Sequence, residues 1–146
     1  MIRPIEPFSL TLNEAASLLG ASLLGDNSVS FFGISHTDSE IEKGDLFLAI
    51  PGTKVHGAKF ADNAIRKGAV AILTDSAGAD MFPEFPTLIV TDVRAAGAIL
   101  SSALYKYPTR DMQSISITGT NGKTSTSFLL KAIFDALGEP TGLIGT

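Results

Sequence analysis

The spacing of apolar residues changes repeatedly along the chain, between the period of a strand and the period of a helix. Short runs of aliphatic and aromatic residues, bounded by glycine or acidic turns, are typical of strands. Apolar residues that recur three or four positions apart are typical of amphipathic helices. The runs predict strands at residues 29–35, 44–50, 69–75, 86–92, 112–118 and 141–145. The helical spacing predicts helices at residues 11–21, 58–68, 93–107 and 123–139.

Capping and breaking residues support the ends of these helices. Thr11 and Glu14 have the spacing of a capping box, which starts a helix by satisfying its first backbone N–H groups. Gly68 can end the second helix in the left-handed conformation, and Pro108 stops the third. We expect the apolar faces of the last two helices to be buried core.

Strands alternate with helices along most of the chain, which predicts an α/β fold with a mostly parallel sheet and right-handed crossovers. The run at 69–75 is apolar on both faces, as in a buried parallel strand. The polar, proline-bearing segment YKYPTRDMQ at 105–113 is the best candidate for a domain boundary. We therefore predict a first domain at residues 1–108 and the start of a second at 109–146. The second piece cannot close a sheet of its own, so we expect this chain to be a fragment of a longer protein.

Composition narrows the classes of protein to which the chain can belong. With 146 residues and 45% hydrophobic content it can bury one core, and its net charge of −4 argues against nucleic-acid or anionic-membrane partners. The chain has no cysteine, which excludes disulfides and thiolate metal sites. No apolar run is long enough to cross a bilayer, and the first ten residues lack the pattern of a signal peptide. We expect a cytoplasmic protein, and nothing in the sequence indicates an oligomer.

The clearest chemical signal is the stretch SISITGTNGKTSTSFLL at 114–130, in which a strand pattern meets a glycine loop and then a helix pattern. Such a turn gathers backbone N–H groups and the positive end of a helix around one point, where a phosphate binds. Lys123 can reach the β- and γ-phosphate oxygens, and the Thr124 hydroxyl can ligate Mg²⁺. The usual loop begins with a glycine where this chain has Ile117. An ordinary strand-to-helix turn with an incidental Gly-Lys-Thr is the alternative.

The loop sequence ITGTNGKTSTS resembles the ATP loop of the Mur ligases, ATP-dependent enzymes that add amino acids to the peptidoglycan precursor. The loop of that family, T-G-[TS]-N-G-K-[TS], has an apolar residue at the position of Ile117. The segment GISHTDSEIEKGDLFLAIPGTKVHGAKFADNAIRKGAVAILTD at 33–75 resembles the N-terminal domain that two branches, MurE and MurF, share. The resemblance therefore implies a UDP-substrate-binding domain at 1–108. It implies the first strand, phosphate loop and helix of the central ATP-binding domain at 109–146.

Three features are more similar to the MurE branch: Thr120, the approach LYKYPTRDMQSISITGTNGKT at 104–124, and the closing GLIGT at 142–146. MurE ligases add the third residue to UDP-MurNAc-L-alanyl-D-glutamate through an acyl phosphate in peptidoglycan synthesis. MurF ligases add the terminal dipeptide, and that activity is one alternative. A non-catalytic nucleotide-binding module and a structural α/β interaction domain are the others.

The resemblance also implies contacts for individual residues. Thr37 and Ser39 would line the pocket for the uracil-nucleotide end of the substrate, and Thr53, Lys54 and Val55 would form a short UDP-binding loop. The ATP phosphates would be held by Gly119, Thr120, Asn121, Gly122, Lys123, Thr124 and Ser125, with the metal on Thr124. On residue type alone, Ser39 is more simply a turn cap and Lys54 a solvated loop charge.

One position departs from the family pattern: its Asp-Ser-Arg is Asp38-Ser39-Glu40 here, so an anion replaces a cation. A substrate contact made by the family arginine is therefore not expected at Glu40. The two histidines, His36 and His56, have no partner carboxylate or serine at a spacing that indicates catalysis. We expect both to be turn or capping residues.

The resemblance implies ATP and Mg²⁺ as cofactors, and the UDP-MurNAc-dipeptide and an amino acid as substrates. The carbamylated lysine of the family, its further Mg²⁺ ligands and its amino-acid-binding domain lie beyond Thr146 in the family order. No catalytic residue is therefore assigned within the chain, and we expect the fragment by itself to be inactive.

Overall fold

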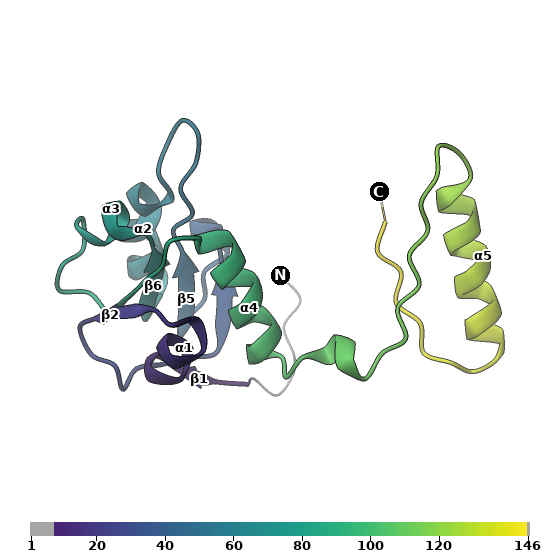
Figure 1. Ribbon diagram of the computed structural model, residues 1–146, viewed down its shortest axis with the longest axis horizontal. Coiled ribbons are helices and arrows are strands. Elements are labelled where there is room, and N and C mark those ends of the chain that lie inside the picture. Colours follow the sequence, from purple (N-terminus) through teal and green to yellow (C-terminus); the bar gives the residue numbers. More distant parts are fainter. Residues whose placement is uncertain (1–7, 146) are drawn as a thin grey trace. The chain divides into compact units, whose positions relative to one another are not determined.

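The computed structural model describes residues 8–145, and the chain divides into two compact units, Met1–Pro108 and Thr109–Thr146. Residues 1–7, on which the expectation about a signal peptide partly rests, lie outside the described range. The first unit contains the sheets, and the second contains a long helix, α5 (Lys123–Ala136) (Figure 1). A 3₁₀ turn, η3 (Pro108–Arg110), lies at the boundary.

The first unit is built around a five-stranded sheet (Figure 1). Its strands, in spatial order, are β2 (Ser22–Leu24), β7 (Thr87–Ile89), β6 (Ala71–Thr74), β5 (Asp45–Leu48) and β4 (Gly33–Ser35). Neighbouring strands from β7 to β4 are parallel, and β2 is antiparallel at the edge. The prediction of an α/β fold with a mostly parallel sheet is confirmed. All four residues of β5 and of β6 are buried, as expected where both faces of a sheet are covered.

The prediction of one continuous strand at 29–35 is wrong. The segment forms two short strands with different partners: β3 (Ser30–Phe31) pairs with β1 (Leu10–Thr11) in a small antiparallel sheet, whereas β4 joins the large sheet. Phe32 lies between them with 45% of its surface exposed, and its N–H donates to the carbonyl of Gly44. The apolar run is continuous, so the available pairing partners decide where the strand breaks.

Helices and 3₁₀ turns connect these strands. In the first unit they are α1 (Leu12–Leu19), η1 (Asp38–Glu40), η2 (Gly57–Phe60), α2 (Ala61–Lys67), α3 (Ser76–Ala79) and α4 (Val93–Leu104). The capping box of α1 is confirmed, because Thr11 Oγ1 accepts from Glu14 N and Glu14 Oε2 accepts from Thr11 N. The backbone N–H of Thr11 holds the pKa of the Glu14 carboxyl below its usual value. Gly68 ends α2 at a φ of 110°, in agreement with the prediction.

Helices cover both faces of the large sheet, so the first unit has three layers (Figure 1). Successive side chains of a strand point to opposite faces, and this places Leu46 and Leu48 of β5 toward α1 and α4 but Phe47 toward α2. The buried residues that α1 and α4 contribute to the first core are Leu12, Ala15, Val93, Ala96, Leu100 and Leu104. The predicted burial of the apolar face at 93–107 is thereby confirmed.

The second unit contains the predicted helix at 123–139 as α5, but neither predicted strand. Residues 112–118 and 141–145 are irregular, because the described part of this unit offers no neighbouring strand to satisfy their backbone groups. The prediction that the apolar face of α5 is core is also wrong here, since no residue of α5 is buried. Its exposed large apolar residues are Phe128, Leu129 and Ile133, followed after the helix by Leu137. Burial of this face needs a surface that residues 109–145 do not supply.

Candidate functional site

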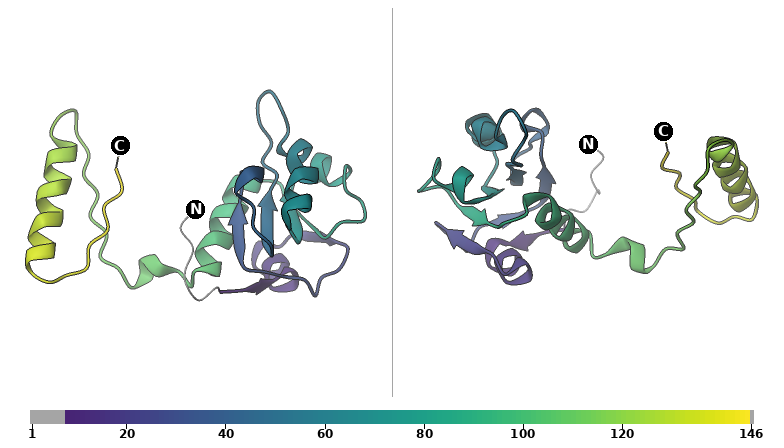
Figure 2. Two further views of the ribbon diagram at one scale, coloured as in Figure 1. Left: turned by 180° about the vertical axis from the view of Figure 1, so that it is seen from behind. Right: turned by 45° about the horizontal axis from the view of Figure 1, so that its top comes forward.

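The carboxyl ends of the parallel strands bring the predicted substrate residues to one edge of the first unit. Ligands of open α/β sheets bind outside the carboxyl ends of the strands. Thr37 and Ser39 follow β4, and Thr53, Lys54 and Val55 follow the adjacent parallel strand β5. The loop after β5 projects beyond the strand ends, as the left view of Figure 2 shows. The structure therefore places both predicted UDP-binding segments at the same edge of the sheet.

The segment after β4 is held by its own backbone and by α2. Ser35, the last residue of β4, is buried, and its Oγ accepts from Thr37 N at 3.1 Å and donates to the Thr37 carbonyl at 3.2 Å. From α2, Asn63 Nδ2 donates to an Asp38 carboxylate oxygen, and Lys67 Nζ donates to the Ser39 carbonyl at 2.7 Å. Within residues 8–145 neither the Thr37 nor the Ser39 hydroxyl makes a hydrogen bond. Both hydroxyls are thus available to a ligand, and Ser39 does not act as a side-chain cap.

The position that departs from the family pattern lies at the end of this segment. Glu40 is exposed and ends η1. The nearby positive charge comes instead from Lys67 of α2, whose ammonium group contacts the Ser39 carbonyl. The segment after β4 therefore combines an exposed carboxylate with a lysine that the motif itself does not contain.

The loop after β5 has a closed stem and an open tip. Gly57 N donates to the Ile50 carbonyl at 3.0 Å, and Pro51 and His56 form an antiparallel bridge. A side chain at Gly57 would meet the backbone of Ile50 at 2.7 Å, so the close approach at the stem requires glycine. The tip residues Thr53, Lys54 and Val55 are all exposed. The stem therefore fixes the base of the loop, while the three predicted contacts face solvent.

His56 in this stem is a capping residue, as the sequence predicts, but it also has a partner that sequence reasoning missed. Its Nδ1 accepts from Ala58 N at 3.0 Å, which caps η2. Its Nε2 lies 3.0 Å from Oδ1 of Asp75, a residue 19 positions later in the chain. The available signal was topological: both residues follow strands of one parallel sheet, β5 and β6, whose carboxyl ends meet at one edge.

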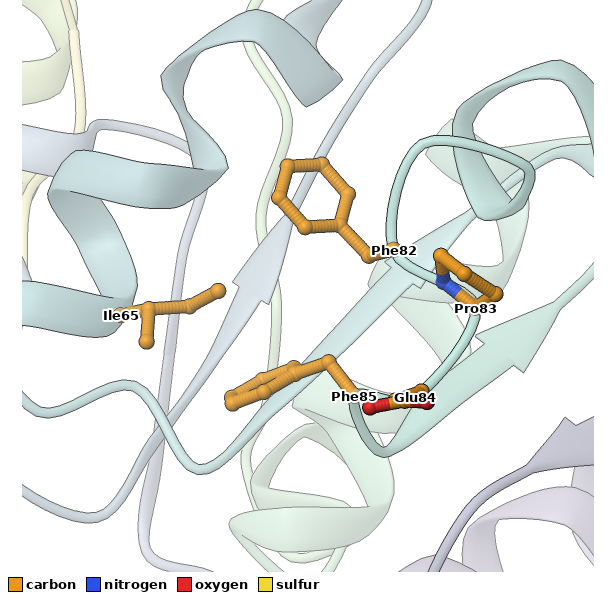
Figure 3. Close-up of a pocket in the computed structure, with 5 residues that line it drawn as sticks. All are labelled: Ile65, Phe82, Pro83, Glu84 and Phe85. Carbon is orange, nitrogen blue, oxygen red and sulfur yellow. The ribbon is translucent and has the colours of Figure 1, made fainter.

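Two pockets of the first unit lie apart from the predicted contacts. One, of about 570 Å³, is at the other end of the carboxyl edge, where Asp75, Ser76 and Thr91 line it together with Leu19, Gly20, Ser22, Ile89 and Val90. The other, of about 360 Å³, is apolar; Figure 3 shows Phe82 and Phe85 projecting from the segment before β7 toward Ile65 of α2. None of the residues implied by the family resemblance lines either pocket.

The phosphate-loop segment of the second unit has the backbone features that the sequence predicts. Gly119 and Gly122 have φ values of 153° and 77°, in the region that favours glycine. Gly122 begins α5 without a side-chain cap, so the first N–H groups of the helix are open to an anion. Lys123 Nζ donates to the Gly119 carbonyl at 2.6 Å and closes the loop on itself. Thr124, the expected metal ligand, lies in the first turn of α5.

Among residues 8–145, no three histidine, aspartate or glutamate side chains come close enough together to form a metal site of their own. No helix in the same range has the length and apolar character needed to span a membrane.

Comparisons with known sequences identify relatives along nearly the whole chain. The sequence profile described as "Mur ligase family, catalytic domain" matches residues 31–104. The UDP-N-acetylmuramoyl-L-alanyl-D-glutamate--2,6-diaminopimelate ligase of Streptomyces coelicolor is 40% identical over an alignment of 146 positions, and the alignment covers 99% of this chain and 28% of that enzyme. The ligase of the same name from Corynebacterium efficiens is 40% identical over an alignment of 148 positions, gaps included, and the alignment covers 97% of this chain and 28% of that enzyme. The chain thus spans little more than a quarter of the length of these relatives.

Solved structures share the fold. A crystal structure of MurF from Acinetobacter baumannii matches with a TM-score of 0.71 at 24% identity and covers 92% of this chain and 29% of that one. The MurF ligase of Thermotoga maritima in complex with ADP matches with a TM-score of 0.51 at 23% identity over 70% of this chain and 23% of that one. The profile match over half of the sequence confirms the resemblance, and the chain belongs to the Mur ligase family.

Proposed function

We propose that the chain is the N-terminal part of an ATP-dependent ligase that adds the third amino acid to UDP-MurNAc-L-alanyl-D-glutamate in peptidoglycan synthesis. The observation that carries this proposal is the identity of about 40%, along nearly the whole chain, with ligases named for that substrate and for 2,6-diaminopimelate. The D-glutamate carboxylate attacks the γ-phosphate of ATP, which forms an acyl phosphate and releases ADP. The amine of the amino acid then attacks the acyl carbon, forms the amide and releases phosphate. Such a ligase works in the cytoplasm, where ATP and UDP-linked precursors are supplied.

In this proposal the first unit, residues 1–108, binds the uridine-diphosphate end of the substrate. Thr37 and Ser39 offer hydroxyls without partners in the described chain, and both lie at the carboxyl edge of the sheet. Thr53, Lys54 and Val55 form the exposed tip of the neighbouring loop, where the Lys54 ammonium can reach a diphosphate. Open α/β sheets bind ligands at this edge, which supports the assignment.

The second unit, residues 109–146, begins the ATP-binding domain. The backbone of Gly119–Ser125 and the open N-terminus of α5 suit the phosphates, and the ammonium of Lys123 can exchange the Gly119 carbonyl for phosphate oxygens. The Thr124 hydroxyl is a hard oxygen ligand of the kind that Mg²⁺ prefers together with phosphate oxygens. Mg²⁺, when bound there, would neutralise charge that develops on the transferring phosphoryl group.

A substrate test separates this proposal from its alternatives. The complete ligase that carries this segment is incubated with ATP, Mg²⁺ and either UDP-MurNAc-dipeptide with diaminopimelate, or UDP-MurNAc-tripeptide with D-alanyl-D-alanine. We expect phosphate release and amide product with the first pair only. Product with the second pair alone would indicate the MurF activity, and nucleotide binding without any amide product would indicate a non-catalytic module. The 146-residue chain by itself should release no phosphate with either pair.

A further inference from the structure

His56 and Asp75 form a connected pair at the carboxyl edge of the sheet. Asp75 Oδ1 accepts from Gly78 N at 2.9 Å and lies 3.0 Å from His56 Nε2. The other ring nitrogen of His56 accepts from the backbone N–H of Ala58. A backbone N–H can only donate, so Nδ1 carries no proton and the neutral ring donates from Nε2 to the carboxylate. The imidazole is therefore fixed in one tautomer between two elements of the fold.

The pair joins the loop after β5 to the end of β6. His56 lies in the stem of the loop at 50–57, and Asp75 is the first residue after β6 and the N-cap of α3. The side chains of His56 and Asp75 are only 23% and 26% exposed. Solvent therefore screens the interaction between the imidazole and the carboxylate only in part. Hydrogen bonds to charged groups are the stronger ones, and partial burial preserves their strength.

Packing leaves the imidazole little freedom. A Cβ at Gly78 would lie 2.8 Å from His56 Cε1 and 2.1 Å from Thr74 Oγ1, so the first turn of α3 rests directly against the ring. Thr74 is fully buried, and its hydroxyl donates at 3.2 Å to the carbonyl of Ala49, the residue just before the loop. The start of the loop and His56 near its end are thus both tied to the carboxyl end of β6.

We propose that His56 and Asp75 are positioning residues that hold the loop at 50–57 in the conformation that receives the uridine nucleotide. The inference rests on the proposed function, which assigns the loop tip Thr53–Val55 to the UDP end of the substrate. Neither His56 nor Asp75 contacts the ligand in this account. The affinity for a ligand falls in proportion to the fraction of time that the loop spends in its binding conformation. Loss of the pair lowers this fraction and so weakens binding.

Substitutions on both sides of the bond separate the pair from ordinary capping. In His56→Asn the amide oxygen can still cap Ala58 N, but the shorter side chain cannot also reach Asp75. In Asp75→Ser the hydroxyl can still cap α3, but it cannot reach the imidazole. Asp75→Asn keeps an acceptor oxygen for both bonds and is the rescuing variant. Asp92→Ser is the matched control, because Asp92 caps α4 at the same edge through Ala95 N at 3.0 Å without a histidine partner.

The test measures UDP binding to the 146-residue chain by calorimetry, and the order of residues 52–58 without ligand by ¹⁵N relaxation and amide hydrogen exchange. We expect His56→Asn and Asp75→Ser to weaken UDP binding by about tenfold and to loosen the loop tip. Asp75→Asn keeps a neutral acceptor for both bonds, so it should weaken UDP binding less than Asp75→Ser does. Asp92→Ser should behave like the unmodified chain. Unchanged affinity and loop order in either His56→Asn or Asp75→Ser would overturn the proposal, and if one of these does not fold the other decides.

The two proposals fail in different ways. If the unmodified chain does not bind UDP, the assignment of the nucleotide site is wrong. The ligand-free relaxation and exchange measurements then still decide the role of the pair. A loop that loosens in His56→Asn and Asp75→Ser supports positioning of the loop by the pair, and a loop that stays ordered in both contradicts it.

Discussion

At the scale of single residues, two lysines of one helix illustrate how position determines the expected role. Lys123 is in the first turn of α5, and its ammonium group donates to the carbonyl of Gly119 in the loop. Lys131 lies further along the same helix, and its Nζ is 2.7 Å from Oδ2 of Asp135, which is four residues later. Exposed ion pairs between such positions contribute little to stability. A lysine beside transferred phosphoryl groups, in contrast, stabilises charge that develops in the transition state.

We predict that Lys123→Ala in the complete ligase lowers kcat by at least about 100-fold, because the developing phosphate charge loses a donor. Lys131→Ala is the matched control and should leave kcat within about twofold. The measurement is phosphate release at saturating UDP-MurNAc-dipeptide, diaminopimelate and ATP. Equal rates for the two variants would contradict the phosphate-loop assignment and favour an ordinary strand-to-helix turn.

At the scale of elements, helix α1 is capped by a side chain that titrates, the carboxyl of Glu14. The hydrogen bonds from Thr11 hold the pKa of the Glu14 carboxyl below its ordinary value of 4.5. A carboxyl whose pKa is lower in the folded state stabilises that state above its unfolded pKa, and this contribution disappears as the pH falls through the folded pKa. The capping box should therefore support α1 at neutral pH and lose its charged form in acid.

We predict that part of the loss of thermal stability between pH 7 and pH 3 comes from Glu14. Glu14→Gln keeps a side chain that can accept from Thr11 N but does not titrate, so its unfolding temperature should fall less over this range than that of the unmodified chain. Circular dichroism melts at both pH values measure the difference. An equal fall in both proteins would show that the capping box contributes no pH dependence.

At the scale of the whole molecule, the two units differ in what stabilises them. The first unit buries two apolar cores on opposite faces of its sheet. The second has a 14-residue helix with no buried residue, and Phe128, Leu129 and Ile133 are more than half exposed. An isolated helix of this length is marginal in water, because packing of an apolar face supplies most helical stability in proteins.

We predict that amide hydrogens of α5 in this 146-residue chain exchange far faster than those of β5 and β6. The strands open only with the core of the first unit, whereas α5 has no buried contacts to hold it closed. In the complete ligase, where more chain is present to cover this face, exchange from α5 should slow strongly. Mass spectrometry of both forms provides the measurement, and strong protection of α5 in the short chain would contradict the prediction.

Local chemistry made much of this structure predictable. The Thr11–Glu14 capping box, the left-handed glycine at Gly68 and the doubly apolar run that became β6 each depend on neighbouring residues, which the sequence displays directly. The break at Phe32 was not predictable, because it depends on which strands lie beside β3 and β4. The His56–Asp75 pair was missed for the same reason, since its partners are 19 residues apart.

The sequence by itself determined the alternation of strands and helices, the glycine loop before α5 and the family to which the chain belongs, because these follow from local patterns and residue identity. The tertiary structure decided which loops share the carboxyl edge, and that an imidazole there meets the carboxylate of the residue that follows the next strand. It also decided that residues 112–118 form no strand and that the apolar face of α5 is exposed. Strand pairing and burial depend on partners elsewhere in space, and the pattern of one segment does not contain them.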